Sequence, residues 1–192
     1  MLNLVLFGPP GAGKGTQSEK IINRFNLTHI STGHLFRKHM CDGSELGKLA
    51  QKYMDDGNLV PDEVVIKMVE HKIQTDAESD GFIFDGFPRT VLQAEALDDL
   101  LRMSDQSISG MILLEVEEEE LINRILLRGK TSGRTDDQDI EKINNRIKIY
   151  HDETLPVANY YNEQGKLKSI KGVGSIDEIF ENISDVIEQL KE

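Results

Sequence analysis

The glycine-rich stretch at residues 8–16, GPPGAGKGT, constrains the fold of this chain more than any other feature. An apolar run at residues 2–7 precedes it, and residues 17–25 follow with apolar side chains at helical spacing. The order is therefore strand, loop and helix start. Glycines let successive backbone N–H groups point at one place, and the helix N-terminus adds partial positive charge. The stretch predicts a binding site for an anionic phosphate, with Lys14 supplying a full charge.

The spacing G-x-x-x-x-G-K fits the phosphate-binding P-loop in a variant form. The common form has Ser or Thr directly after the lysine, whereas Gly15 follows Lys14 here and the hydroxyl comes at Thr16. A strand before the loop and a helix after it are the context that the motif requires.

Composition restricts the classes of protein to which the chain can belong. Its 192 residues are enough for one solid core with small inserted lobes. The formal net charge of −12 disfavours nucleic acid and anionic membranes as partners. A single cysteine, Cys41, allows neither an internal disulfide nor a cysteine-based zinc site. No apolar run approaches the roughly 20 residues of a membrane span, and no signal-peptide pattern appears, so we expect a cytoplasmic protein.

Strand and helix patterns alternate along the whole chain. Beyond residues 2–7, short apolar runs predict strands at residues 27–30, 82–84, 111–116 and 167–170. This alternation predicts an α/β, P-loop three-layer fold, with a central parallel β-sheet flanked by helices. Two segments interrupt the pattern: residues 31–60, which we interpret as an inserted lobe, and residues 129–137, a polar stretch predicted to be a flexible turn.

Asp85 directly follows the predicted strand at residues 82–84. Ligands bind at the carboxyl ends of the strands in open parallel sheets. Carboxylate oxygens suit Mg²⁺, which accompanies nucleotide phosphates. We therefore expect Asp85 to hold Mg²⁺ directly or through water.

Arginines are concentrated near these segments although the chain is acidic. Of eight arginines, only Arg24 and Arg102 read as ordinary surface residues. Guanidinium groups bind phosphate oxygens in a bidentate manner, so a converging set predicts more than one phosphorylated ligand. The remaining six are Arg37, Arg89, Arg124, Arg128, Arg134 and Arg146.

The sequence offers no base that would activate a hydroxyl acceptor. A phosphate acceptor needs none, because a phosphate monoester is mostly dianionic at neutral pH. Arginines would then neutralise the repulsion between two polyanions and stabilise the charge that develops on the transferring group.

Taken together, these motifs resemble those of the adenylate kinase family, in the family's order and over essentially the whole chain. The motifs are GPPGAGKGT at residues 8–16, STG at 31–33, DGFPRT at 85–90, Gln93, the pair Arg124 and Arg128, and SGRTDD at 132–137.

The resemblance implies an enzyme that transfers a phosphoryl group reversibly from ATP to AMP with Mg²⁺. The implied catalytic residues are Lys14, Arg89, Arg124, Arg128, Arg134 and Arg146. The implied ATP site comprises Gly11, Ala12, Gly13, Lys14, Gly15, Thr16, Arg124, Arg128 and Gly174. The implied AMP site comprises Thr32, Arg37, Asn58, Leu59, Val60, Gly86, Phe87, Pro88, Arg89, Gln93, Arg134 and Arg146, with Gln93 reading the adenine edge.

The resemblance also implies a division of the chain. Residues 1–30, 61–128 and 138–192 would form the P-loop core, 31–60 the monophosphate-binding lobe, and 129–137 a short lid without structural zinc. His34 stands where the family usually has an acidic residue, and we expect it to face solvent. Arg146 follows the SGRTDD motif at a spacing one residue longer than in much of the family. No oligomerisation seam is evident, so a monomer is expected.

Three alternatives stay open at this point. UMP/CMP kinases share the P-loop and short lid, although Thr32 and Thr90 favour AMP over those acceptors. A small-molecule kinase acting on a hydroxyl would need a base that the sequence does not supply. A non-catalytic nucleotide-binding module would be expected to have lost Lys14, Asp85 or the arginines, all of which are present.

Overall fold

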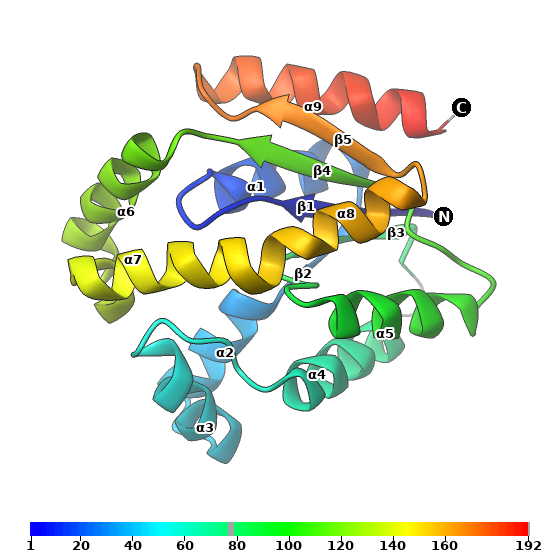
Figure 1. Cartoon of the computed structure of the whole chain (residues 1–192). Coiled ribbons are helices and arrows are strands. Elements are labelled where there is room, and N and C mark those ends of the chain that lie inside the picture. Colours follow the sequence, from blue (N-terminus) through cyan, green and yellow to red (C-terminus); the bar gives the residue numbers. More distant parts are fainter. Residues whose placement is uncertain (77–78, 192) are drawn as a thin grey trace.

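The computed structural model describes residues 1–76 and 79–191 and is built on one five-stranded sheet (Figure 1). The strand order is β2-β3-β1-β4-β5, and every neighbouring pair is parallel. This confirms the predicted α/β class with its central parallel sheet. The strands are β1 (Leu2–Phe7), β2 (Thr28–Ser31), β3 (Gly81–Asp85), β4 (Gly110–Glu115) and β5 (Leu167–Lys171).

Helices make the connections between the strands. Within the described residues, no helix combines the length and the apolarity needed to cross a membrane. The helices are α1 (Lys14–Phe25), α2 (Thr32–Cys41), α3 (Glu45–Met54), α4 (Asp62–Thr75), α5 (Val91–Arg102), α6 (Glu118–Ser132), α7 (Ile140–Ile149), α8 (Leu155–Glu163) and α9 (Ile176–Lys191), with a 3₁₀ turn η1 (Thr135–Asp137) and a π-helical turn η2 (Tyr150–Thr154).

The central strand β1 is buried on both faces because successive side chains alternate across a sheet. Leu4 and Leu6 belong to one hydrophobic cluster, which α1 and α9 complete. Val5 and Phe7 belong to the other, with residues of α4, α5 and α8. Figure 1 shows these helices on opposite sides of the sheet. The result is three layers, with helices on both faces of the sheet.

The carboxyl ends of three adjacent strands meet at one edge of the sheet. Ser31 at the end of β2 pairs with Asp85 at the end of β3, and Asp85 pairs with Leu6 of β1. The chain leaves β1 into the glycine-rich loop at this same edge. Parallel pairing therefore brings residues far apart in sequence to one place, where the candidate site lies.

Helices α2 and α3 form a small projection below the sheet in Figure 1. They lie within residues 31–60, the segment interpreted as an inserted lobe; the three-part division of the chain stays a prediction. His34, in the first turn of α2, is exposed as expected. The side chain of Ser44 caps α3 by accepting a hydrogen bond from the Gly47 amide at 3.1 Å.

Replacing Gly47 with alanine is expected to destabilise this lobe. A Cβ atom at Gly47 would overlap the backbone carbonyl of His39, so α2 and α3 would have to move apart. Overpacking of this kind costs about 1–3 kcal/mol, and each kcal/mol lowers the melting temperature of a chain of this size by about 2–4 °C. Thermal unfolding monitored by circular dichroism measures the loss. Gln51→Ala, at an exposed position of α3, is the matched control; equal melting temperatures for the two variants would contradict the close packing.

The predicted flexible turn at residues 129–137 is partly wrong. Residues 129–132 continue α6, and the helix ends at Gly133, whose φ of 67° is left-handed. Glycine adopts this conformation at little cost and commonly terminates helices. The polar letters GKTS suggested a loop, but polar residues are compatible with a helix on a solvent-facing surface. Only residues 133–137 leave the α-helix, and three of these form η1.

Candidate active site

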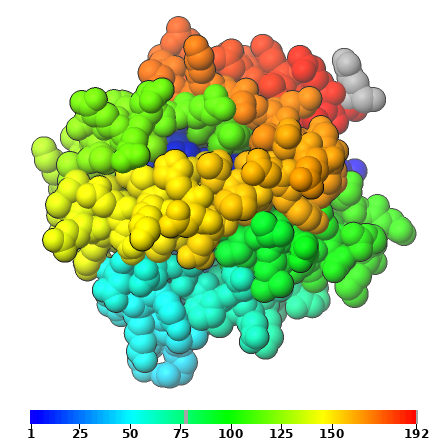
Figure 2. All heavy atoms as spheres, in the orientation of Figure 1, coloured from blue at the N-terminus to red at the C-terminus, as the bar shows by residue number. Residues whose placement is uncertain are grey.

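A cavity of about 520 Å³ lies at the carboxyl edge of the sheet. The glycine-rich loop, the turn after β3, and arginines from α2, α6, α7 and the segments before α5 and after α6 line it. Figure 2 shows a hollow in which atoms of the N-terminal segment (blue) are visible between α6 (green) and the later part of the chain. The cavity therefore joins the predicted phosphate-binding loop to the arginine set.

The glycine-rich loop has the conformation that its glycines predict. Gly11 and Gly13 have φ values of 85° and 94°, which side-chain-bearing residues rarely adopt. A Cβ atom on Gly11 would also lie 2.9 Å from the Leu121 carbonyl oxygen. Helix α1 begins immediately afterwards at Lys14, so its N-terminus faces the cavity. These features give backbone N–H groups and a helix dipole to an anion.

The Lys14 side chain folds over the loop. Its Nζ donates hydrogen bonds to the carbonyl oxygens of Gly8 at 2.6 Å and Pro9 at 2.9 Å. Burial, with help from the nearby positive charges, lowers the pKa of Lys14 to about 8, although Asp85 opposes the shift. An ammonium held in this way has its charge incompletely compensated, and an anionic phosphate would compensate it.

Asp85 lies at the end of β3 with its carboxylate in the cavity lining. Its Oδ2 is 3.7 Å from Nε2 of His29 and 3.5 Å from Oγ of Ser31. Burial raises the pKa of Asp85, but His29, Lys14 and Arg89 outweigh burial and hold it below its ordinary value. Asp85 is therefore an ionised oxygen donor facing the phosphate-binding loop.

Positive charge converges on the cavity from separate elements. Arg89 lies in the turn after β3, Arg37 in α2 and Arg128 in α6, and all three line the same space. Burial and Arg134 lower the pKa of Arg37 to about 10, so it stays charged at neutral pH. Arg89 is exposed on the cavity wall, yet burial among the surrounding protein atoms and the charge of Arg146 lower its pKa. Guanidinium groups brought together against their own repulsion indicate a polyanionic ligand.

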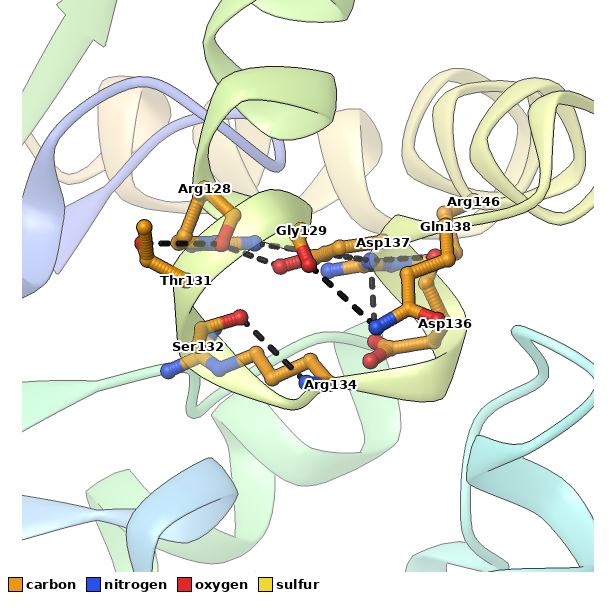
Figure 3. Close-up of polar contacts among 9 residues, drawn as sticks. All are labelled: Arg128, Gly129, Thr131, Ser132, Arg134, Asp136, Asp137, Gln138 and Arg146. Carbon is orange, nitrogen blue, oxygen red and sulfur yellow. Dashed lines mark hydrogen bonds and ion pairs between the residues drawn. The ribbon is translucent and has the colours of Figure 1, made fainter.

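Asp137 joins two of these arginines, and sequence analysis assigned it no role. Its side chain is 0% exposed and accepts hydrogen bonds from Arg128 Nε at 2.6 Å and Nη2 at 2.8 Å. It also accepts one from Arg146 Nη1 at 2.7 Å. Figure 3 shows the two guanidinium groups directed at this carboxylate. Burial raises the pKa of Asp137, but the two arginines outweigh burial and lower it. Its position in the SGRTDD motif was the only sequence signal.

A second, smaller cleft opens beside Arg89. Its lining is mostly apolar, with Phe36, Met54 and Val65 among the contributors. Gln93 lines it as well and is only 2% exposed. Such a cleft, with few polar groups at fixed positions, suits a flat heterocycle whose phosphate end reaches the arginines.

The polar segment after α6 contacts the lobe formed by α2 and α3. Thr135 Oγ1 donates a hydrogen bond to Asp55 Oδ1 at 3.0 Å. Asn145 Nδ2 in α7 donates to the Asp56 carbonyl and to Asn58 Oδ1, both at 3.1 Å. Figure 2 shows α7 (yellow) resting on the lobe (cyan). The cavity is thus covered from this side.

The predicted site residues fall into three groups. The large cavity is lined by Gly11, Ala12, Gly13, Lys14, Gly15, Thr16, Arg37, Asn58, Leu59, Asp85, Gly86, Phe87, Pro88, Arg89, Arg124, Arg128, Arg134 and Arg146. The small cleft adds Thr32, Val60 and Gln93. Gly174 contributes to neither lining.

Arg124 approaches the segment that contains Gly174. Its Nη1 donates a hydrogen bond to the Gly172 carbonyl at 3.0 Å, and its Nε donates to Glu120 at 2.7 Å. The turn between β5 and α9 is thereby tied to an arginine that lines the cavity. The role implied for Gly174 stays a prediction.

Comparison with known proteins identifies the family. The family model for adenylate kinase matches residues 6–166, which is most of the chain. The chain belongs to the adenylate kinase family. The adenylate kinase of Flavobacterium psychrophilum is 52% identical over 99% of this chain and 100% of its own length. That of Parabacteroides distasonis is 49% identical over the whole of both chains, and that of Flavobacterium johnsoniae 48% over 99% of this chain.

Family membership accounts for the geometry around the cavity. An adenylate kinase is a phosphotransferase, so the chain is an enzyme, and the resemblance drawn from the motifs is confirmed. The adenylate kinase fold also agrees with the three-layer architecture around the P-loop. The non-catalytic alternative is not favoured.

Proposed function

We propose that this adenylate kinase family member transfers the γ-phosphoryl group of ATP to AMP in a reversible, Mg²⁺-dependent reaction that yields two ADP. The observation that carries the proposal is the single cavity that joins the P-loop to arginines from separate elements. Two polyanions can meet there because positive charge from both sides offsets their repulsion.

ATP would bind on the P-loop side of the cavity. Backbone N–H groups of residues 11–16 and the N-terminus of α1 would hold its phosphates, together with Lys14. Arg128 would contact the outer phosphates. Arg124 and the turn containing Gly174 would border the adenine.

AMP would bind between the small cleft and Arg89. The apolar lining would take the base, with Gln93 at its edge. Arg37 and Arg89 would grip the monophosphate, since both lie where the turn after β3 approaches α2. The remaining contacts would come from Thr32, Asn58, Leu59, Val60, Gly86, Phe87 and Pro88.

The chemical step would depend on positioning and charge. The AMP phosphate is itself the nucleophile, so no side chain has to remove a proton. Arg89, Arg134 and Arg146 would align donor and acceptor and stabilise the charge that spreads over the transferring oxygens. The contact between Thr135 and Asp55 would help to exclude water that could otherwise accept the phosphoryl group.

Asp85 fits a magnesium ion that is held mostly by phosphate and water. Mg²⁺ commonly takes one or two carboxylates and completes its shell with water and substrate oxygens. Asp85 supplies one such carboxylate, and Thr16 lines the same cavity. No three His, Cys, Asp or Glu side chains gather as metal ligands within residues 1–76 and 79–191. When bound, the ion would neutralise charge on the ATP phosphates.

A coupled assay tests the acceptor. ATP with AMP, UMP, CMP or GMP in turn should give the highest kcat/KM with AMP. A higher kcat/KM with any other monophosphate would overturn the proposal. A preference for UMP or CMP would support the UMP/CMP kinase alternative. The cytoplasmic location and monomeric state stay predictions; light scattering coupled to size-exclusion chromatography measures the latter.

Affinity for a non-hydrolysable ATP analogue should fall as the pH rises above about 8, by up to about tenfold per pH unit. Lys14 has a pKa of about 8 in the free protein, and phosphates favour its charged form. Binding above this pH must therefore take up a proton. Calorimetric titrations at a series of pH values measure the effect. Lys14→Met should bind more weakly with a flat profile, and an unchanged pH slope in this variant would refute the assignment to Lys14.

A further inference from the structure

The carboxamide of Gln93 is held between two partners. Its Oε1 accepts a hydrogen bond from the backbone N–H of Arg89 at 2.8 Å. Its Nε2 donates to Asp62 Oδ1 at 2.7 Å. Asp62 starts α4 and comes from a different part of the chain than Gln93 in α5. The amide is thus fixed at both ends inside a nearly inaccessible position.

These partners allow one orientation of the amide. A carboxamide can turn by about 180° and exchange its oxygen and nitrogen at little cost when its neighbours are indifferent. The two neighbours of Gln93 do distinguish the oxygen from the nitrogen, because a backbone N–H only donates and a carboxylate only accepts. A turned amide would place N–H against N–H at Arg89 and oxygen against oxygen at Asp62. Asp62 and the Arg89 N–H together determine which end of Gln93 is the donor, and Asp62 is the side chain that can be replaced.

Asp62 is itself fixed by Thr90. The Thr90 hydroxyl donates to Asp62 Oδ2 at 3.1 Å. Thr90 Oγ1 in turn accepts from the backbone N–H of Gln93 at 3.2 Å and so caps α5. Asp62, Thr90 and Gln93 form a closed ring of contacts between the N-terminal turns of α4 and α5. The carboxylate also lies in the first turn of α4, where the helix dipole favours negative charge.

The fixed amide has consequences for a purine in the small cleft. After its two contacts, Gln93 retains one N–H and one oxygen lone pair. Adenine presents an acceptor at N1 and a donor at N6, whereas hypoxanthine and guanine present a donor at N1 and an acceptor at O6. A base whose phosphate end is anchored cannot reverse its N1 and 6-position edge. Hypoxanthine or guanine would therefore be matched only if the Gln93 carboxamide turned by 180°. A mismatched polar pair in a buried site strongly rejects the wrong base.

We propose that Asp62 determines acceptor-base specificity by locking Gln93 in the orientation that matches adenine and opposes 6-oxopurines. The inference rests on the proposed function, since it takes a nucleoside monophosphate as the occupant of the small cleft. Asp62 acts through Gln93 and is a positioning residue.

The test compares AMP with inosine monophosphate (IMP). IMP reverses the donor and acceptor at positions 1 and 6 without adding the 2-amino group of guanine. Asp62→Ala should lower the AMP-to-IMP ratio of kcat/KM about tenfold, since one of the two constraints on the amide is gone. Asp62→Asn should keep the ratio within about threefold of wild type, because its Oδ1 can still accept from Gln93 while its Nδ2 donates to Thr90.

Controls separate this role from general damage to the fold. Glu63→Ala, at the exposed neighbouring position of α4, should leave the ratio unchanged. A merely structural role for Asp62 would lower both activities in parallel, and an unchanged ratio in Asp62→Ala would overturn the inference. If that variant does not fold, Asp62→Ser replaces it, because serine is well tolerated at a helix start and lacks the reach of the carboxylate. Absence of AMP turnover in the wild type would instead refute the proposed function.

Discussion

Replacing Arg89 with alanine is expected to lower kcat/KM for AMP by about 10²–10³-fold. Arg89 lines both the large cavity and the small cleft, and its Nε donates to the Gly86 carbonyl at 2.9 Å, which fixes the guanidinium at their junction. Removing one preorganised donor from a site where charge develops typically costs about 2.7–4 kcal/mol. The coupled ATP and AMP assay measures the loss.

Two further variants make the Arg89 result specific. Arg89→Lys should recover only part of the activity, because an ammonium keeps the charge but cannot bind a phosphate through two parallel hydrogen bonds. Arg102→Ala removes an arginine at the C-terminal end of α5, the helix that follows Arg89. The Arg102 side chain is 72% exposed. This control should behave as wild type. A loss of less than about threefold in Arg89→Ala would place Arg89 outside the site.

The fold could be predicted from sequence because each layer leaves a local pattern. Buried parallel strands give short apolar runs, and glycines at the end of the first strand indicate the phosphate-binding loop. Asp85 was found in the same way, since the carboxyl end of a strand in a parallel sheet faces the ligand edge. These signals depend on neighbouring residues and on general topology, so they are visible without coordinates.

Contacts between distant segments could not be predicted in this way. Asp137 reads as one of two adjacent polar aspartates, and its burial between arginines of α6 and α7 depends on how those helices pack. Asp62 reads as a helix-start residue, and its hold on Gln93 appears only when α4 and α5 are placed side by side. The flexible turn was predicted to begin at residue 129, four residues too early, because the polar sequence GKTS is compatible with both a loop and the end of a helix. Pairing of charges and orientation of amides are properties of the tertiary structure.

Replacing Asp137 with asparagine is expected to lower both stability and activity. The carboxylate holds Arg128 and Arg146, whose guanidinium groups would otherwise repel each other. Removing one partner of a buried ion pair typically costs about 3–5 kcal/mol, and we expect about 3 kcal/mol because Arg128 is partly open to water. At about 2–4 °C per kcal/mol, the melting temperature should fall by about 6–12 °C. Loss of alignment of the two arginines should lower kcat/KM by about 10²-fold.

The dependence on pH distinguishes the lost ion pair from simple misfolding of Asp137→Asn. The folded-state pKa of Asp137 lies below its ordinary value of 3.8, so its stabilising contribution is present above that value and is lost as the pH falls through the folded-state pKa. The difference in unfolding free energy between wild type and variant should therefore be constant near neutrality and shrink below about pH 4. Urea unfolding at a series of pH values measures it, with Asp152→Asn, which removes an exposed charge in η2, as the control. A difference that stays constant into acid would show that Asp137 acts through packing alone, because only an ionised carboxylate can hold both guanidinium groups.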